Sequence, residues 1–95
     1  MPKKTADLMP AVEHHLQALG KRIHMACLRR KLSQGDVAER CDMSRPTVRK
    51  IFEGDSGVSM GHYLSVIALV NMEKDIDQLL AFDKEGYDIM DKELL

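Results

Sequence analysis

The chain lacks several features that would each assign it to a particular class of protein. It has no run of about 18 apolar residues, so no segment is predicted to span a membrane. The N-terminus, MPKKTADLMP, has no apolar core of signal-peptide length, and we expect a cytoplasmic protein. The 95 residues suffice for one small domain with a modest core, to which dimerisation would add buried surface.

Motifs for catalysis and for metal binding are also missing. The two cysteines, Cys27 and Cys41, fall on predicted core faces and are interpreted as small buried hydrophobes in a reducing compartment. The four histidines combine with them in none of the spacings of a zinc site. No phosphate-binding glycine loop, nucleophile motif or general-acid pair is present. We therefore expect no metal, no cofactor and no enzymatic activity.

Charge is close to balanced overall, with a net charge of −1, but it is unevenly distributed along the chain. Residues 21–50 hold nine basic residues against three acidic ones, whereas residues 71–95 hold eight acidic residues against three lysines. A basic middle and an acidic end suggest one surface that faces phosphate and another that faces away from it or toward a partner.

The segment SQGDVAERCDMSRPTVRKIF, residues 33–52, predicts two short helices joined by a tight turn. Ser33 can cap the first helix, and Asp36 stands three residues later, where a capping box places an acidic group. Asp42 tolerates the left-handed conformation that a sharp turn requires. Ser44 can cap the second helix, and Pro46 falls in its first turn, where a missing N–H costs nothing. The predicted inner faces consist of Val37, Ala38, Cys41, Val48, Ile51 and Phe52, and Gly54 ends the second helix.

The outer face of the second helix carries hydrogen-bond donors that the core does not need. Two short helices joined by a turn, with a basic outer face on the second, form a helix-turn-helix arrangement, whose second helix enters a DNA major groove. Arg45 is expected to read guanine, since a guanidinium can pair with O6 and N7, and Pro46 can touch a thymine methyl. Arg49 and Lys50, one turn further along, are the next candidates for base reading. Phosphate contacts are expected from Lys31, Gln34, Ser44 and Thr47.

The segment LGKRIHMACLRRKLSQGDVAERCDMSRPTVRKIFEGD resembles the helix-turn-helix domain of Cro, phage repressors and the xenobiotic-response-element family of regulators. The resemblance covers about residues 16–71 and implies a lambda-repressor-like DNA-binding domain. In that family the glutamine at Gln34 holds the DNA backbone and packs against the recognition helix. The family often has glycine where Asp42 stands, and a paired arginine and glutamate where Cys27 and Phe52 stand. We interpret the apolar pair as a contact that replaces an ion pair.

The next segment, VSMGHYLSVIALVNMEKDIDQLLAFDKEG, is similar to the HipB-like antitoxins, which are encoded beside HipA-type kinases. The pattern consists of the Val-Ser-Met-Gly start of a helix and a later Asp-Lys-Glu-Gly. This resemblance implies a repressor of its own operon that also binds a HipA-like toxin kinase.

Along the whole chain, the pattern predicts an all-α bundle of five or six helices. We expect a flexible N-terminal tail (1–10), a helix-turn-helix DNA-binding domain (11–71) and C-terminal helices that form a dimer or partner contact (72–95). The helices outside the motif are predicted at 10–31, 60–70, 74–82 and 87–95, with Gly86 interrupting the last two. The apolar residues of the last helix could instead pack back onto the preceding one.

The expected function is that of a sequence-specific repressor, a homodimer on an inverted-repeat operator in duplex DNA. A HipB-like antitoxin is the preferred biological role. The alternatives are a stand-alone or prophage repressor without a toxin, and a protein-interaction module on a helix-turn-helix scaffold. The clustered charges of Arg45, Arg49 and Lys50 count against the interaction module, which would not need them.

Overall fold

The computed structural model describes residues 7–94 and, within them, contains helices and no strands. This arrangement confirms the predicted all-α fold. The predicted tail at 1–10 falls mostly on residues 1–6, which lie outside the described residues, and α1 begins at Pro10. The helices are α1 (Pro10–Arg29), α2 (Gln34–Arg40), α3 (Arg45–Glu53), α4 (Met60–Leu69), the 3₁₀ helix η1 (Glu73–Gln78) and α5 (Lys84–Leu94).

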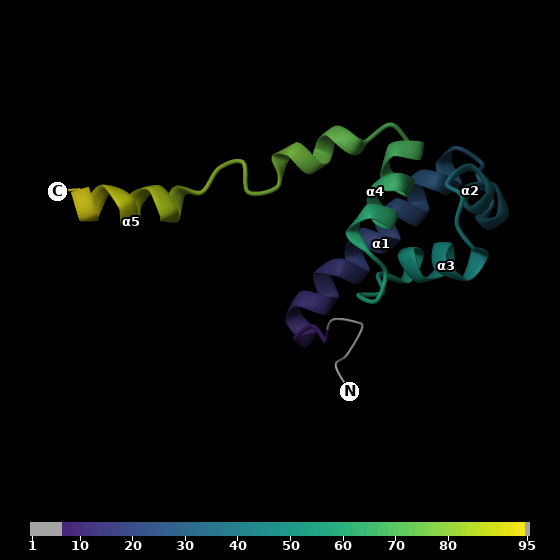
Figure 1. Ribbon diagram of the computed structural model, residues 1–95, viewed down its shortest axis with the longest axis horizontal. Helices are drawn as coiled ribbons and strands as arrows, with labels where there is room; N and C mark the ends of the chain where they lie inside the picture. Colours follow the sequence, from purple (N-terminus) through teal and green to yellow (C-terminus); the bar gives the residue numbers. More distant parts are fainter. Residues whose placement is uncertain (1–6, 95) are drawn as a thin grey trace.

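The first four helices form the body of the molecule (Figure 1). The long α1 packs against α3, and the short α2 packs against both α3 and α4. The buried side chains come from all four helices, and from Val70 directly after α4, because each helix turns one apolar stripe inward. They are Ile23, Ala26, Cys27, Val37, Ala38, Val48, Ile51, Tyr63, Val66 and Val70.

Two glycines allow α1 to approach the end of α3 closely. A Cβ atom at Gly20 would lie 2.5 Å from the carbonyl oxygen of Ile51 and 2.6 Å from the backbone nitrogen of Gly54. A Cβ atom at Gly54 would in turn collide with the backbone of Leu16 and Gln17. No side chain fits between these two backbones, so this contact sets the distance of α3 from α1.

Four α-helices end in the same way, with a residue of positive φ that closes a Schellman turn. After α1, Lys31 has φ 57°, and the N–H of Leu32 donates to the carbonyl of Cys27 at 3.0 Å. The predicted first helix therefore ends at Arg29 rather than at Lys31. Asp42 (φ 52°) and Gly54 (φ 71°) end α2 and α3 as predicted. Asn71 (φ 62°) follows α4, whose last residue is Leu69 rather than Val70.

The helix predicted at 74–82 is wrong in type and in length. Its N-terminal part is the 3₁₀ helix η1, and Leu80 (φ 59°) breaks the helical path. The physical reason is the missing core contact: only Ile76 in this segment is partly buried, while Leu79 and Phe82 remain exposed. A short helix without a buried face gains too little to extend.

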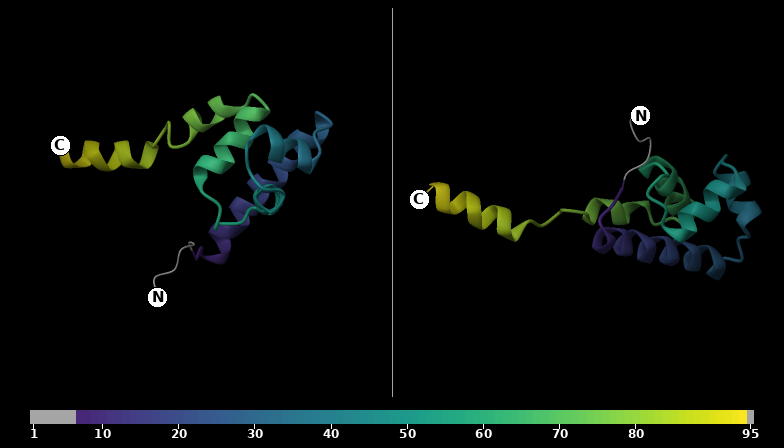
Figure 2. Two further views of the ribbon diagram at one scale, coloured as in Figure 1. Left: turned by 45° about the vertical axis from the view of Figure 1, so that its right-hand side comes forward. Right: turned by 90° about the horizontal axis from the view of Figure 1, so that it is seen from below.

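The last helix also differs from its prediction. It begins at Lys84 rather than at Tyr87 and includes Gly86, which was expected to interrupt it. The reason is a local cap, because the Asp83 carboxylate accepts the N–H of Gly86 at 2.9 Å. Figures 1 and 2 show α5 projecting away from the body, so it does not pack back onto the preceding helix. None of the helices in the described part of the chain combines the length and apolar character needed to cross a membrane.

Candidate nucleic-acid interface

The interface begins with α2, whose N-terminus is held by the predicted capping box. Ser33 Oγ accepts the N–H of Asp36 at 3.0 Å, and Asp36 Oδ2 accepts the N–H of Ser33 at 2.9 Å. The hydrogen bonds from Ser33, and the nearby charges of Arg40 and Arg45, lower the pKa of the Asp36 carboxyl below its usual value. The box therefore fixes the direction in which the chain enters α2.

The N-terminus of α3 is capped in turn by a pair of hydroxyl groups. Ser44 Oγ accepts the N–H of Thr47 at 3.1 Å and lies 2.7 Å from Thr47 Oγ1. Pro46 occupies the first turn, where its missing N–H leaves no bond unmade. Thus the predicted cap of the second motif helix is present, and it brings two of the predicted phosphate ligands into contact with each other.

Gln34 connects the two motif helices directly. Its Nε2 donates to the carbonyl oxygen of Arg45 at 2.9 Å, joining the start of α2 to the start of α3. The side chain is only partly exposed. The expected packing of Gln34 against the recognition helix is present, so the remaining face of its amide is fixed beside the N-terminus of α3.

The guanidinium of Arg45 lies over Gly35 in α2. A Cβ atom at Gly35 would lie 2.8 Å from Nη2 and 3.1 Å from Cζ of Arg45, so the absence of a side chain makes room for it. The same guanidinium is close enough to Asp36 to lower the pKa of that carboxyl. Arg45 is nevertheless exposed, so its head group can leave this position without breaking the core.

The remaining predicted base readers share the outer face of α3. Pro46, Arg49 and Lys50 are exposed, while Val48 and Ile51 on the inner face are completely buried. Lys31 is exposed in the left-handed turn between α1 and α2. The structure therefore places three predicted base readers on one surface, with Lys31, Gln34, Ser44 and Thr47 on the turns and helix starts of the motif.

The inner side of α3 makes a contact that was not predicted from the sequence. The ring of Phe52 stacks on His24 of α1, with centroids 4.2 Å apart and planes 11° apart. Cys27, one turn further along α1, is fully buried, and Phe52 packs against the same core. The sequence feature that could have indicated this stacking is His24, which stands three residues before the predicted core residue Cys27. Likewise, the close approaches at Gly20 and Gly35 were not predicted.

The cysteines are free, and burial raises the pKa of both thiols. Within residues 7–94, no three His, Cys, Asp or Glu side chains gather in an arrangement that could hold a metal ion.

The structure therefore has two capped helices joined by a left-handed turn. The second helix packs by its inner face and is exposed on its outer face. This arrangement defines the class of helix-turn-helix proteins. A family model described as a helix-turn-helix domain matches residues 18–79, which is more than half of the chain. The chain belongs to this family. No curated protein matches it.

Proposed function

We propose that this protein is a sequence-specific transcriptional repressor that binds duplex DNA through α3. The observation that carries the proposal is the outer face of α3, where Pro46, Arg49 and Lys50 are exposed beside Arg45. None of these side chains is needed by the core, which α3 reaches through Val48 and Ile51. A short, rigidly anchored helix with cationic donors on its free side fits the major groove.

In the proposed complex, the side chains divide into those that read bases and those that contact phosphates. Arg45 leaves Gly35 to pair with a guanine, Arg49 and Lys50 read bases one turn further on, and Pro46 contacts a thymine methyl. Since Gln34 and the Ser44–Thr47 pair are already fixed by hydrogen bonds, they can bind phosphate with little loss of side-chain entropy. Lys31 supplies a further phosphate contact from its turn.

We further propose that the repressor acts as a homodimer on an inverted repeat. A two-fold axis between the copies would place two α3 helices in successive major grooves, about 34 Å apart. Segment 11–71 would then serve as the DNA-binding domain, and segment 72–95, which carries most of the acidic residues, would serve for contacts with protein.

The biological role that we propose is that of a HipB-like antitoxin that represses its own operon and binds a HipA-like toxin kinase. The two short patterns behind this resemblance both begin helices: Ser59 caps α4 by accepting the N–H of His62, and Asp83 caps α5. The acidic C-terminal segment offers this partner a surface remote from the basic motif. Co-expression with the product of a neighbouring kinase gene tests this role, and failure to co-purify would favour a stand-alone or prophage repressor.

DNA binding is tested by a mobility shift on the protein's own promoter, with random DNA as competitor. A shift that survives competition, together with a two-fold symmetric footprint, is expected. A folded protein that gives no specific shift, either alone or with its partner, would contradict DNA reading and favour the protein-interaction module.

The variant Arg45→Ala refines this test. It should weaken operator binding by about 1–3 kcal/mol and relax the preference at one base pair, because a bidentate contact is lost. Lys92→Ala, which removes one positive charge from the distant α5, is the matched control and should bind as the unmodified protein does. Equal loss on operator and random DNA would make Arg45 a backbone contact instead.

A further inference from the structure

The apolar face of α5 has no partner within the body of the molecule. Tyr87, Ile89 and Met90 are 58%, 53% and 57% exposed, and the helix projects away from the first four helices in every view of Figures 1 and 2. At 3.6 residues per turn, Asp91 stands at one edge of this face, beside Tyr87, and Glu93 stands between Ile89 and Met90. The helix therefore presents an exposed apolar stripe that carries two acidic groups.

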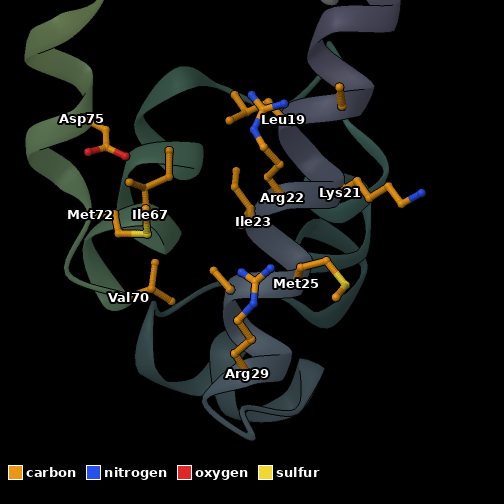
Figure 3. Close-up of a pocket in the computed structure, with 12 residues that line it drawn as sticks. Leu19, Lys21, Arg22, Ile23, Met25, Arg29, Ile67, Val70, Met72 and Asp75 are labelled. Carbon is orange, nitrogen blue, oxygen red and sulfur yellow. The ribbon is translucent and has the colours of Figure 1, made fainter.

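The molecule carries an open groove of about 630 Å³ between α1 and the segment that runs from α4 into η1. Figure 3 shows Arg22 and Arg29 of α1 extending along its opening, with Met72 and Asp75 on the other side. The two arginines are seven residues apart, so they point to the same side of α1. The apolar residues that line the groove include Leu19, Ile23, Ala26, Ile67 and Val70.

The helix and the groove match in length and in charge. The part of α1 that lines the groove runs from Ala18 to Arg29, about 17 Å at 1.5 Å per residue, and α5 has nearly the same length. The α1 side of the groove carries Lys21, Arg22 and Arg29, whereas α5 has four acidic residues and two lysines. An apolar stripe that carries acidic groups thus fits an apolar groove with basic side chains on its α1 side.

We infer that the occupant of this groove is α5 of a second copy of the chain. The α5 helix of each copy docks in the groove of the other, so the same contact occurs twice, related by a two-fold axis. In this dimer Asp91 and Glu93 pair with Arg22 and Arg29, while Tyr87, Ile89 and Met90 cover the apolar lining.

The path of the chain favours a second copy over the same copy as the donor of the helix. Met72 and Asp75 line the groove, yet after η1 the chain leaves the body (Figure 1). Only residues 79–83 connect η1 to α5, and fully extended they span about 17 Å. To fill its own groove, α5 would have to reverse direction within that span. The groove of a second copy can bind α5 without any change in the direction of the chain.

The pairing is compatible with DNA binding by α3. Gly20 and His24, which contact α3, lie on the opposite side of α1 from Arg22 and Arg29. Docking of an acidic helix on that side leaves α3 free and keeps the acidic residues away from DNA. The inference rests on the homodimer of the proposed function and adds its interface, but it can be tested without DNA.

The test measures the mass of the full chain by sedimentation across a range of concentrations. The unmodified protein should be a dimer that dissociates on dilution. Arg22→Glu combined with Arg29→Glu, and separately Asp91→Lys combined with Glu93→Lys, should each raise the dimer Kd about a hundredfold, because each places like charges opposite one another. Asp88→Lys is the control, because Asp88 lies on the side of α5 opposite the apolar face, and it should leave the dimer intact.

An equimolar mixture of the groove variant and the α5 variant distinguishes exchange between copies from folding within one copy. In a mixed dimer one contact is unmodified and the other joins glutamates to lysines, so the dimer should reform. Circular dichroism of each variant checks that it is folded, which is expected because all four substituted side chains are exposed.

Three results would overturn the inference. They are a folded unmodified protein that stays monomeric, charge variants that dimerise as before, and a mixture that remains monomeric. The last would indicate a contact of α5 within its own chain or at a different surface. A protein that dimerises as expected but binds no operator would contradict the proposed DNA binding and leave the interface standing.

Discussion

Gly20 and Gly54 are the residues that bring the backbones of α1 and α3 together, and through them the outer face of α3 is positioned on the molecule. Because the Cβ of an alanine at Gly20 would meet backbone atoms rather than a movable side chain, the two helices would have to separate. The position of the outer face of α3 therefore depends on the absence of a Cβ atom at Gly20, which lies in a different helix.

We predict that Gly20→Ala lowers the free energy of unfolding by about 1–3 kcal/mol, the usual cost of overpacking. Urea denaturation measures this change. Gly61→Ala is the matched control, since a Cβ there would meet only Ser59 Oγ, at 3.8 Å, and the stability of this variant should be unchanged or slightly higher. Equal stability of the two variants would show that α1 and α3 can separate at no cost.

Asp36 is the residue through which pH should act on the motif. Its pKa is lower in the folded protein than in the unfolded chain, so its contribution to stability is fully present above the unfolded value of about 3.9. The contribution is lost as the pH falls through the folded value, because the protonated carboxyl no longer accepts the Ser33 N–H as an anion.

The stability difference between the unmodified protein and Asp36→Ala should therefore be larger at neutral pH than at acidic pH. Thermal unfolding of both proteins over a series of pH values measures it. A difference that stays constant with pH would mean that the charge of Asp36 has no part in the cap.

At the scale of the elements, the helices of the body are defined mainly by their ends. Serine caps begin α2, α3 and α4, and left-handed residues follow all four helices of the body. Only one of those left-handed residues is a glycine, so Lys31, Asp42 and Asn71 occupy a conformation that costs a side chain about 1–2 kcal/mol. This cost is smaller for aspartate and asparagine, whose side chains tolerate the conformation.

The turn between α2 and α3 provides a test of how much the left-handed conformation costs a residue with a side chain. Asp42→Gly should keep the fold and raise the stability by up to about 1 kcal/mol, because φ is 52° here and glycine adopts it freely. Asp42→Val should lower the stability, since a β-branched side chain strongly disfavours the same φ. Chemical denaturation of the two variants gives opposite signs if the turn is as described, and equal signs would contradict it.

The motif helices were predictable because their caps, turn and apolar stripe lie within a few residues of each other. Ser33, Asp36 and Ser44 act as their local signals indicate. The prediction failed at residues 74–82, where the apolar residues resemble a helical stripe but find no core to cover. Whether an amphipathic segment becomes a helix depends on a partner surface, which the local pattern does not show.

At the scale of the whole molecule, opposite charges are segregated. The basic residues of the middle segment lie in the first three helices and the turns between them, whereas the acidic C-terminal segment extends away from these helices to one end of a molecule measuring 56 × 38 × 20 Å. Although the net charge is near zero, positive and negative charges are separated along the molecule. This separation would orient the protein on DNA.

If the basic side binds phosphates, operator affinity should fall linearly on a plot of log K against log salt concentration. Lys31→Ala should reduce the magnitude of this slope by about 1 and weaken binding to operator and random DNA alike, since a phosphate contact carries no sequence information. Binding titrations at several salt concentrations measure both effects. Lys92→Ala should leave the slope unchanged, and a slope unaffected by Lys31→Ala would remove that lysine from the interface.

The sequence by itself determined the helices of the body, their caps and the two faces of α3, because these depend on interactions between residues a few positions apart. Only the tertiary structure decided that Gly20 meets Gly54, that Arg45 rests on Gly35, and that Phe52 stacks on His24, because each contact joins different helices. It also decided that α5 stands apart from the body. That outcome depends on which surfaces are left to cover once the first four helices have packed.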